Sequence, residues 1–136
     1  MLKKKLPILI LLCLLLAGMF LFSAQDAPSS SKVSGGIVDF LCNLGLPVTD
    51  HLVRKTAHFL EFMLLGILMY LLIPRFYSWI FCILIAMADE FHQLFVSGRG
   101  SQWADVALDA AGALFGILLI WCIGRLKARI PKNRKK

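Results

Sequence analysis

The sequence predicts an all-α integral membrane bundle of four transmembrane helices, with a short interfacial helix in the first outer loop. Apolar residues make up 59% of the 136 residues, whereas a soluble domain contains about 45–50%. They fall in four long blocks, and a helix satisfies its own backbone amides inside hydrocarbon. The alternating segments of about ten residues that a membrane barrel needs are missing from the sequence. The length allows one small domain.

The first apolar block covers residues 6–24 and follows Lys3, Lys4 and Lys5. It holds about 19 residues, enough to cross about 30 Å of hydrocarbon. A cleavable signal peptide has a similar composition, but Phe22 stands two residues before Ala24, where cleavage needs a small residue. We therefore expect residues 1–24 to remain as a transmembrane helix with a basic cytoplasmic N-terminus.

The second region, residues 25–51, is expected to be an extracytoplasmic linker and interfacial helix. Residues 25–36 are rich in Ser, Pro and Gly, which is typical of a linker. Residues 37–44 then repeat apolar side chains every three or four positions, which favours a short amphipathic helix on the membrane surface. Cys42 is the one cysteine expected outside, so no intramolecular disulfide is predicted.

Residues 52–124 are expected to form a three-helix core, followed by a basic tail at residues 125–136. The apolar blocks of this core cover residues 52–73, 76–95 and 103–124. Both basic termini belong in the cytoplasm by the positive-inside rule, and an even number of spans brings them to the same side. We therefore expect a multi-pass cell-membrane protein whose loops at 25–51 and 96–102 lie outside. The net charge of +7 comes from residues that flank apolar blocks, which indicates topology signals and lipid contacts, with no nucleic acid as partner.

Ionisable side chains gather at the outer ends of the last three blocks, although such a group costs about 2.5–3.5 kcal/mol at a helix centre. Their spacing of three, four or seven residues places each set on one helix face. The sets are Arg54, His58 and Glu61; Asp89, His92 and Gln93; and Asp105 and Asp109.

The last of these sets continues into Gly112 and Gly116, a close-packing Gly-x-x-x-Gly surface. Such a surface must touch another helix, so Asp105 and Asp109 should face the bundle interior. The three polar faces are therefore expected to meet in one pocket at the outer membrane face.

The pocket would contain more carboxylates than cations. Arg54, Lys55 and Arg99 face five acids: Glu61, Asp89, Glu90, Asp105 and Asp109. The excess negative charge has to be met by protonation, by His58 or His92 as cations, or by a bound cation. The alternative interpretation is that these groups form helix-end ion pairs that fix packing, with Lys55 extending to the membrane surface.

The candidate site residues fall into two groups according to the role that their side chains could play. The candidate catalytic residues are His58, Glu61, Asp89, Glu90, His92 and Asp109. The candidate phosphate- or head-group-binding residues are Arg54, Lys55, Arg99, Gln93 and Asp105. The pairs His58/Glu61 and Asp89/His92 have the i, i+3 spacing of helix-bundle metal ligands, so a divalent metal stays open as cofactor while its ligands are not assigned.

Three motifs, in this order and at these intervals, resemble the VanZ-like family of small membrane proteins, named for a teicoplanin-resistance factor. The motifs are Arg54-Lys55-Thr56-Ala57-His58-Phe59-Leu60-Glu61-Phe62, Asp89-Glu90-Phe91-His92-Gln93-Leu94-Phe95-Val96-Ser97-Gly98-Arg99, and Asp105-Val106 with Asp109-Ala110-Ala111-Gly112. Two positions differ: Ser97 stands where proline is expected, and Phe62 where tyrosine is common. The resemblance implies a role in the bacterial cell envelope and reduced susceptibility to lipid-seeking glycopeptides. It supplies no reaction, so enzymatic activity stays open.

Two functions follow from these observations. In the first, the outer pocket binds or modifies a phospholipid or a lipid-linked cell-wall intermediate. In the second, the chain is a non-enzymatic interaction protein whose charge network is structural. An ion-coupled transporter is disfavoured because the cytoplasmic halves of the blocks are apolar. The sequence defines neither the substrate nor the oligomeric state.

Overall fold

The computed structural model describes residues 2–100 and 102–129, and in these ranges the chain is entirely helical apart from its connections. The five helices are α1 (Leu2–Ser23), α2 (Ala27–Asn43), α3 (Asp50–Leu72), α4 (Arg75–Gln93) and α5 (Trp103–Arg129). The expected all-α class is therefore confirmed. The basic tail was predicted to start at residue 125, but α5 continues to Arg129; residues 130–136 lie outside the described ranges.

Three of the helices are long and apolar enough to cross a membrane: Lys5–Ser23 within α1, Asp50–Leu72 and Trp103–Arg129. Helix α4 has 19 residues but does not meet the same standard of apolar composition. The reason lies in its C-terminal end, where Asp89, Glu90, His92 and Gln93 follow one another almost without interruption. Length and composition thus support three spans, and the expected fourth is not confirmed by them.

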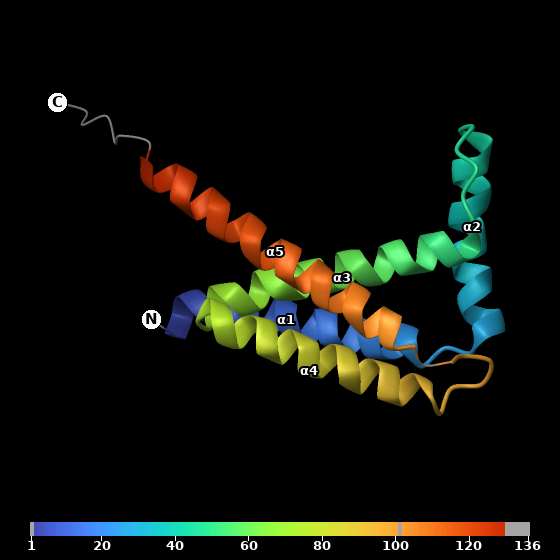
Figure 1. Cartoon of the computed structure of the whole chain (residues 1–136), viewed down its shortest axis with the longest axis horizontal. Coiled ribbons are helices and arrows are strands. Elements are labelled where there is room, and N and C mark those ends of the chain that lie inside the picture. The colour runs from blue at the N-terminus through green and yellow to red at the C-terminus, as the bar shows by residue number, and fades with distance from the viewer. Residues whose placement is uncertain (1, 101, 130–136) are drawn as a thin grey trace.

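The bundle is built around the crossing of α3 and α5, with α1 and α4 packed alongside (Figure 1). Helix α2 stands across one end of the bundle. The start of α1 and the end of α5 lie at the opposite end (Figure 1). The buried core joins four helices, through Met19, Phe62, Leu65, Cys82, Ala86 and Ala113.

Helices α3 and α5 approach so closely that their backbones touch. A methyl group built on Gly112 would overlap the carbonyl of Phe59, and one on Gly116 would overlap the carbonyl of Met63. From the other side, a methyl group on Gly66 would overlap the carbonyl of Ala113. The predicted Gly-x-x-x-Gly packing surface is therefore confirmed, and its partner is α3.

Helix α2 is longer than the sequence suggested, since it includes most of the expected linker. Asp26 caps the helix by accepting a hydrogen bond of 3.1 Å from the amide of Ser29, and Pro28 is tolerated in the first turn because no intrahelical partner is needed there. The hydroxyls of Ser31 and Ser34 bond to the carboxylate of Asp50 at the start of α3. Capping and these tertiary contacts outweigh the low helix propensity of the Ser and Gly residues.

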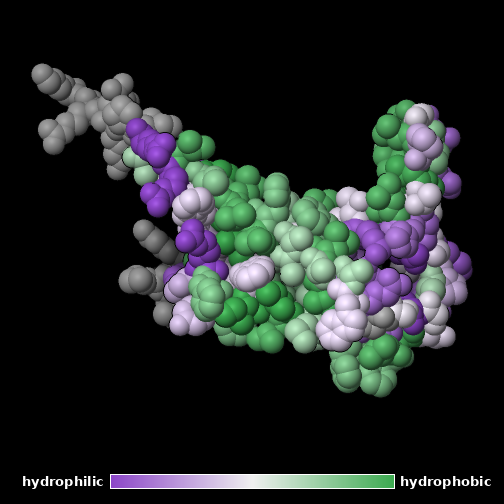
Figure 2. Space-filling view, viewed as in Figure 1, coloured by the Kyte–Doolittle hydropathy of each residue, from purple (hydrophilic) through white to green (hydrophobic). Residues whose placement is uncertain are grey.

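The charges separate along the bundle. All eight acidic residues lie in α2, in its cap, or in the halves of α3, α4 and α5 nearest to it. At the opposite end Lys5 donates a 2.9 Å hydrogen bond to the carbonyl of Leu72. There, too, the guanidinium groups of Arg75 and Arg125 lie 5.0 and 5.3 Å from the ring centre of Trp121. Figure 2 shows hydrophilic surface at both ends and an apolar belt between them.

Candidate functional site

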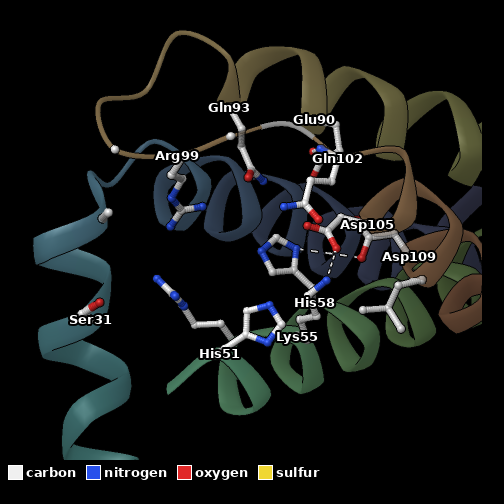
Figure 3. Close-up of a pocket in the computed structure, with 15 residues that line it drawn as sticks. Ser31, His51, Lys55, His58, Glu90, Gln93, Arg99, Gln102, Asp105 and Asp109 are labelled. Atoms are coloured by element: carbon white, nitrogen blue, oxygen red, sulfur yellow. Dashed lines mark hydrogen bonds and ion pairs between the residues drawn. The ribbon is translucent and has the colours of Figure 1, made fainter. Parts of the chain in front are cut away.

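A polar cavity of about 270 Å³ lies at the α2 end of the bundle. Its walls come from α2, α3, the end of α4, the α4–α5 loop and the start of α5, and side chains from all of them point inward (Figure 3). The polar lining residues are Ser31, His51, Arg54, Lys55, His58, Glu90, Gln93, Arg99, Gln102, Asp105 and Asp109.

Most of the candidate residues from the sequence line this cavity, so the polar faces of α3, α4 and α5 do meet. Glu61 lies one turn further along α3 and lines a neighbouring cavity. Asp89 is not among the lining residues, but one of its carboxylate oxygens lies close to His58 and Asp109. His92 does not join them: its ring stacks against Phe20 of α1 with centroids 4.8 Å apart. The i, i+3 step from Asp89 is enough to turn His92 toward α1.

Two of the three cations of the site are paired within the protein. Lys55 on α3 forms an ion pair with Asp105 on α5, and both side chains are about a third exposed (31% and 27%). Arg54 pairs with Asp50, one turn earlier on α3, at 3.1 Å. Lys55 therefore links α3 to α5, and does not simply extend to the membrane surface as in the alternative interpretation.

The third cation, Arg99, lies in the loop between α4 and α5. Its Nη2 donates to the carbonyl of Phe22 at 3.2 Å, and its side chain points into the cavity (Figure 3). Gly98 has a φ of 74°, a conformation that favours glycine. Burial, and then repulsion from Arg54, lowers the pKa of Arg99, whereas Asp89 and Glu90 raise it. Arg99 still stays charged, because arginine is effectively always protonated.

Asp109 is the most enclosed carboxylate of the site. It is 1% exposed, and within the described residues neither of its oxygens has a hydrogen-bond partner. The nearest cation candidate is His58, whose Nδ1 lies 3.9 Å from Oδ1. Asp89 is better satisfied, since Gln93 Nε2 donates to its Oδ2 at 2.9 Å. One ligand atom each from His58, Asp89 and Asp109 lie within 4.8 Å of one another, an arrangement that could hold a metal ion.

A second cavity of about 230 Å³ adjoins the first. Much of its wall is apolar and comes from α1, α2 and α3, through Phe22, Val33, Ile37, Val53 and Ala57. Arg54, His58 and Arg99 belong to the linings of both cavities. These three side chains thus stand where a polar space meets an apolar one.

The sequence reasoning missed three polar residues of the first cavity: Ser31, His51 and Gln102. His51 precedes Arg54 by three residues and His58 by seven, so the spacing rule that selected those two would also have selected it. Gln102, whose amide donates to Glu90 Oε2 at 3.0 Å, lies in a loop without periodicity. Ser31 fell in the expected linker, so no sequence signal pointed to it.

The fold and the site together define a small helical membrane protein with a polar cavity at one end. The family model for VanZ/LLP1 matches residues 8–124, and the chain belongs to this family, as its motifs indicated. No curated protein and no solved structure matches the chain.

Proposed function

We propose that the chain crosses the cell membrane four times, with both termini in the cytoplasm and α2 on the outer surface. The distribution of basic residues supports this topology, because most Lys and Arg residues lie near the two chain termini or at the α3–α4 connection, and only Lys32, Arg54, Lys55 and Arg99 lie toward α2. Helix α4 is the fourth span: its 19 residues suffice for about 28 Å at a rise of about 1.5 Å per residue. Its charged outer end is shielded by the bundle.

The exposed face of α2 supports its place at the membrane surface. Val33, Ile37, Phe40 and Leu44 are each about half exposed or more, and their spacing puts them on one face of the helix. Figure 2 shows the apolar side of α2 turned toward the apolar belt of the bundle. An amphipathic helix in that position buries this face in the boundary between head groups and acyl chains.

The topology is tested with Cys42, an exposed cysteine of α2. A membrane-impermeant thiol reagent should label the protein in intact cells, and the variant Cys42→Ser should abolish the label. Labelling of correctly inserted protein only after lysis would place α2 inside and contradict the topology.

For the site, the proposed function is binding of the phosphate-bearing head group of a membrane phospholipid or a lipid-linked cell-wall intermediate. The observation that carries it is the shared wall of the two cavities, where Arg54, His58 and Arg99 face both a polar and an apolar space. A phosphate between two guanidinium groups gains charge-assisted hydrogen bonds. The attached hydrocarbon chain would enter the cavity bordered by Phe22 and Ile37.

The same site contains groups suited to modifying such a lipid. His58 Nδ1 lies 3.9 Å from Asp109 Oδ1, so a small rotation of either side chain would bring the pair to the hydrogen-bonding distance that general acid–base catalysis uses. Glu61 lines the adjoining cavity one turn away. In an enzymatic version of the proposal that works without a metal, these three residues move protons, while Arg54 and Arg99 bind phosphate.

A binding experiment separates this function from its alternative. The full-length protein in maltoside micelles is titrated with a short-chain phosphatidic acid and with the matching diacylglycerol, which lacks phosphate. We expect tighter binding of the phosphate-bearing lipid. Because a hydrogen bond to a charged group contributes about 1.5–3 kcal/mol, Arg99→Ala should weaken that binding about tenfold or more. Arg75→Ala, at the opposite end of α4, is the matched control and should bind as the unchanged protein does.

The alternative is a non-enzymatic interaction protein whose charge network is structural. The pairs Lys55–Asp105 and Arg54–Asp50 favour it, since they satisfy two cations without any ligand. Equal affinity for both lipids, unaffected by Arg99→Ala, would support this alternative. The alternative would also be supported if the His58→Gln and Glu61→Gln variants lost their effect on glycopeptide susceptibility only in proportion to a lower amount of protein in the membrane.

The proposed cellular consequence is protection against glycopeptides that carry a lipid tail. Each buried CH₂ of such a tail contributes about 0.8 kcal/mol to membrane partition, so a change in surface lipid acts mainly on the tailed drug. Expression in a susceptible Gram-positive host should raise the inhibitory concentration of teicoplanin more than that of vancomycin, and Arg99→Ala should remove the difference. Equal protection against both drugs would point to altered cell-wall precursors.

A further inference from the structure

We propose that His58, Asp89 and Asp109 bind a divalent transition-metal ion of the Zn²⁺ or Mn²⁺ type. The three residues come from α3, α4 and α5, so the site exists only where these helices meet. Their ligand atoms lie within 4.8 Å of one another. Around a tetrahedral ion with bonds of about 2.0–2.2 Å, ligand atoms are about 3.3–3.6 Å apart. Small side-chain rotations therefore suffice to close the site.

Asp109 supplies an independent observation that points to a cation. It is 1% exposed, and both carboxylate oxygens lack a hydrogen-bond partner in the part of the chain that the structure describes. A buried ionised carboxylate without compensation is strongly destabilising, so such a group takes up a proton, pairs with a cation or coordinates a metal. Two other groups of the cavity leave Asp109 without a hydrogen bond. Lys55 is engaged with Asp105, and His58 Nδ1 lies 3.9 Å from Oδ1, close enough for an ion pair only when the imidazole is protonated and too far for a hydrogen bond.

The surroundings of Asp89 match those of a metal ligand. Gln93 is buried and donates from Nε2 to Oδ2 of Asp89 at 2.9 Å, which fixes the orientation of the carboxylate. Outer-shell hydrogen bonds of this kind hold ligands in position in metal sites. The carboxylate of the adjacent residue, Glu90, has a different partner, because it accepts a hydrogen bond from the backbone amide of Gln102.

The donor set identifies the class of ion. One imidazole nitrogen and two carboxylate oxygens suit Zn²⁺ and Mn²⁺ better than the softer ions that select thiolates. Three protein ligands leave a coordination position open, as in catalytic zinc sites. His58 and Asp109 line the polar cavity, so the open position is accessible from the space into which Arg99 points (Figure 3).

The site is held in place by the backbone contact between α3 and α5 that lies next to it. Phe59, whose carbonyl lies against Gly112, directly follows His58, and Gly112 is three residues after Asp109. Because the two backbones are in contact here, the distance between His58 and Asp109 can change only slightly. This inference does not rest on lipid binding: His58 lines both cavities, but neither Arg54 nor Arg99, the proposed phosphate-binding residues, is among the ligands.

The test uses the tag-free full-length chain in maltoside micelles, stripped with EDTA and then equilibrated with Mn²⁺ or Zn²⁺ alone. Elemental analysis should find one equivalent of metal per chain, and the melting temperature should rise with metal concentration. No phosphorylated lipid is present, so the outcome is separate from that of the lipid experiment. Binding well below one equivalent, without a thermal shift at millimolar metal, would overturn the inference.

Asp109→Asn is the decisive variant, because it keeps the shape of the side chain and removes the charge. Metal affinity should fall at least about tenfold, the lower limit even for loss of an outer-shell partner. Asp89→Asn should also lose metal.

Asp105→Asn provides the matched control for metal content, since it lies one turn away on the same helix and faces Lys55. It should retain one equivalent. If Asp109→Asn and Asp89→Asn bound as tightly as the original, or if Asp105→Asn lost as much metal as they do, the assigned site would be wrong.

Discussion

The two ends of the contact between α3 and α5 differ sharply although they belong to the same pair of helices. At Gly112 and Gly116 the helices touch backbone to backbone, with no room for a methyl group. Within two turns toward α2, the same helix faces hold Asp105 and Asp109 against Lys55 and a cavity of about 270 Å³. We call the first part the glycine contact and the second the polar cavity.

This difference shows how a small bundle can hold charged groups at a defined separation. In a membrane, helices associate through close packing of small residues, because lipid is as apolar as their side chains. The glycine contact therefore provides much of the stability of the α3–α5 pair. The polar cavity then needs to contribute little to stability, which leaves groups such as Arg99 and Asp109 available for binding. The following predictions test this division, beginning with the largest expected effect.

Gly112→Ala and Gly116→Ala should be the most destabilising of the changes. Each added methyl would meet a backbone carbonyl of α3, which cannot move without shifting the helix, and overpacking of this kind costs about 1–3 kcal/mol. The free energy of unfolding is measured by titrating the protein in maltoside micelles with sodium dodecyl sulfate. Gly124→Ala is the matched control on α5, because nothing lies within 4 Å of the added methyl. If all three variants were equally stable, the glycine contact would not be the main support of the bundle.

Trp79→Phe should have a smaller effect. Trp79 of α4 donates a 3.3 Å hydrogen bond from Nε1 to the carbonyl of Ala110 on α5, at the boundary between the glycine contact and the polar cavity. Hydrogen bonds between helices in membranes contribute about 0.6 kcal/mol on average. The same unfolding titration should therefore show a loss of about that size. A loss comparable to that of Gly112→Ala would mean that α4 supports the bundle as much as α3 does.

The pair Lys55–Asp105 should contribute about 0.2–1 kcal/mol, as partly exposed ion pairs do. A double-mutant cycle with Lys55→Met and Asp105→Asn measures this coupling directly. The value should decrease as salt is added, since both side chains reach solvent. A coupling well above this range would mean that the polar cavity also stabilises the fold.

Asp26→Ala should have the smallest and most local effect, limited to the start of α2. The hydrogen bonds from Ser29 lower the pKa of Asp26, so its contribution is present above the ordinary carboxyl range and is lost as the pH falls through the lowered value. Protection factors of the first α2 amides, including those of Ser29 and Ser30, should fall in the variant. They should also fall in the original protein at low pH, each rate being compared with the intrinsic exchange rate at the same pH. The amides of α3 and α5 should be unchanged. Faster exchange in α3 would indicate that α2 stabilises the bundle as well.

Periodicity and spacing were enough to predict much of the site. Intervals of three and four residues assigned polar faces to α3, α4 and α5, and Gly112 with Gly116 indicated that the aspartates of α5 face inward. These are properties of a single helix, in which the direction of the side chains repeats every 3.6 residues. The same rule placed His92 with Asp89, but the structure turns it toward Phe20, because a three-residue step leaves a side chain at the edge of a face.

The apolar blocks, the helical class, the polar faces and the family motifs were determined by the sequence alone, since each depends on residues close together in the chain. Only the tertiary structure decided which groups meet. It extended α2 through the expected linker by joining Ser31 and Ser34 to Asp50. It also paired Lys55 with Asp105 and left Asp109 buried beside His58. The physical reason is that such contacts depend on the distances and crossing of separate helices, which close packing between them sets.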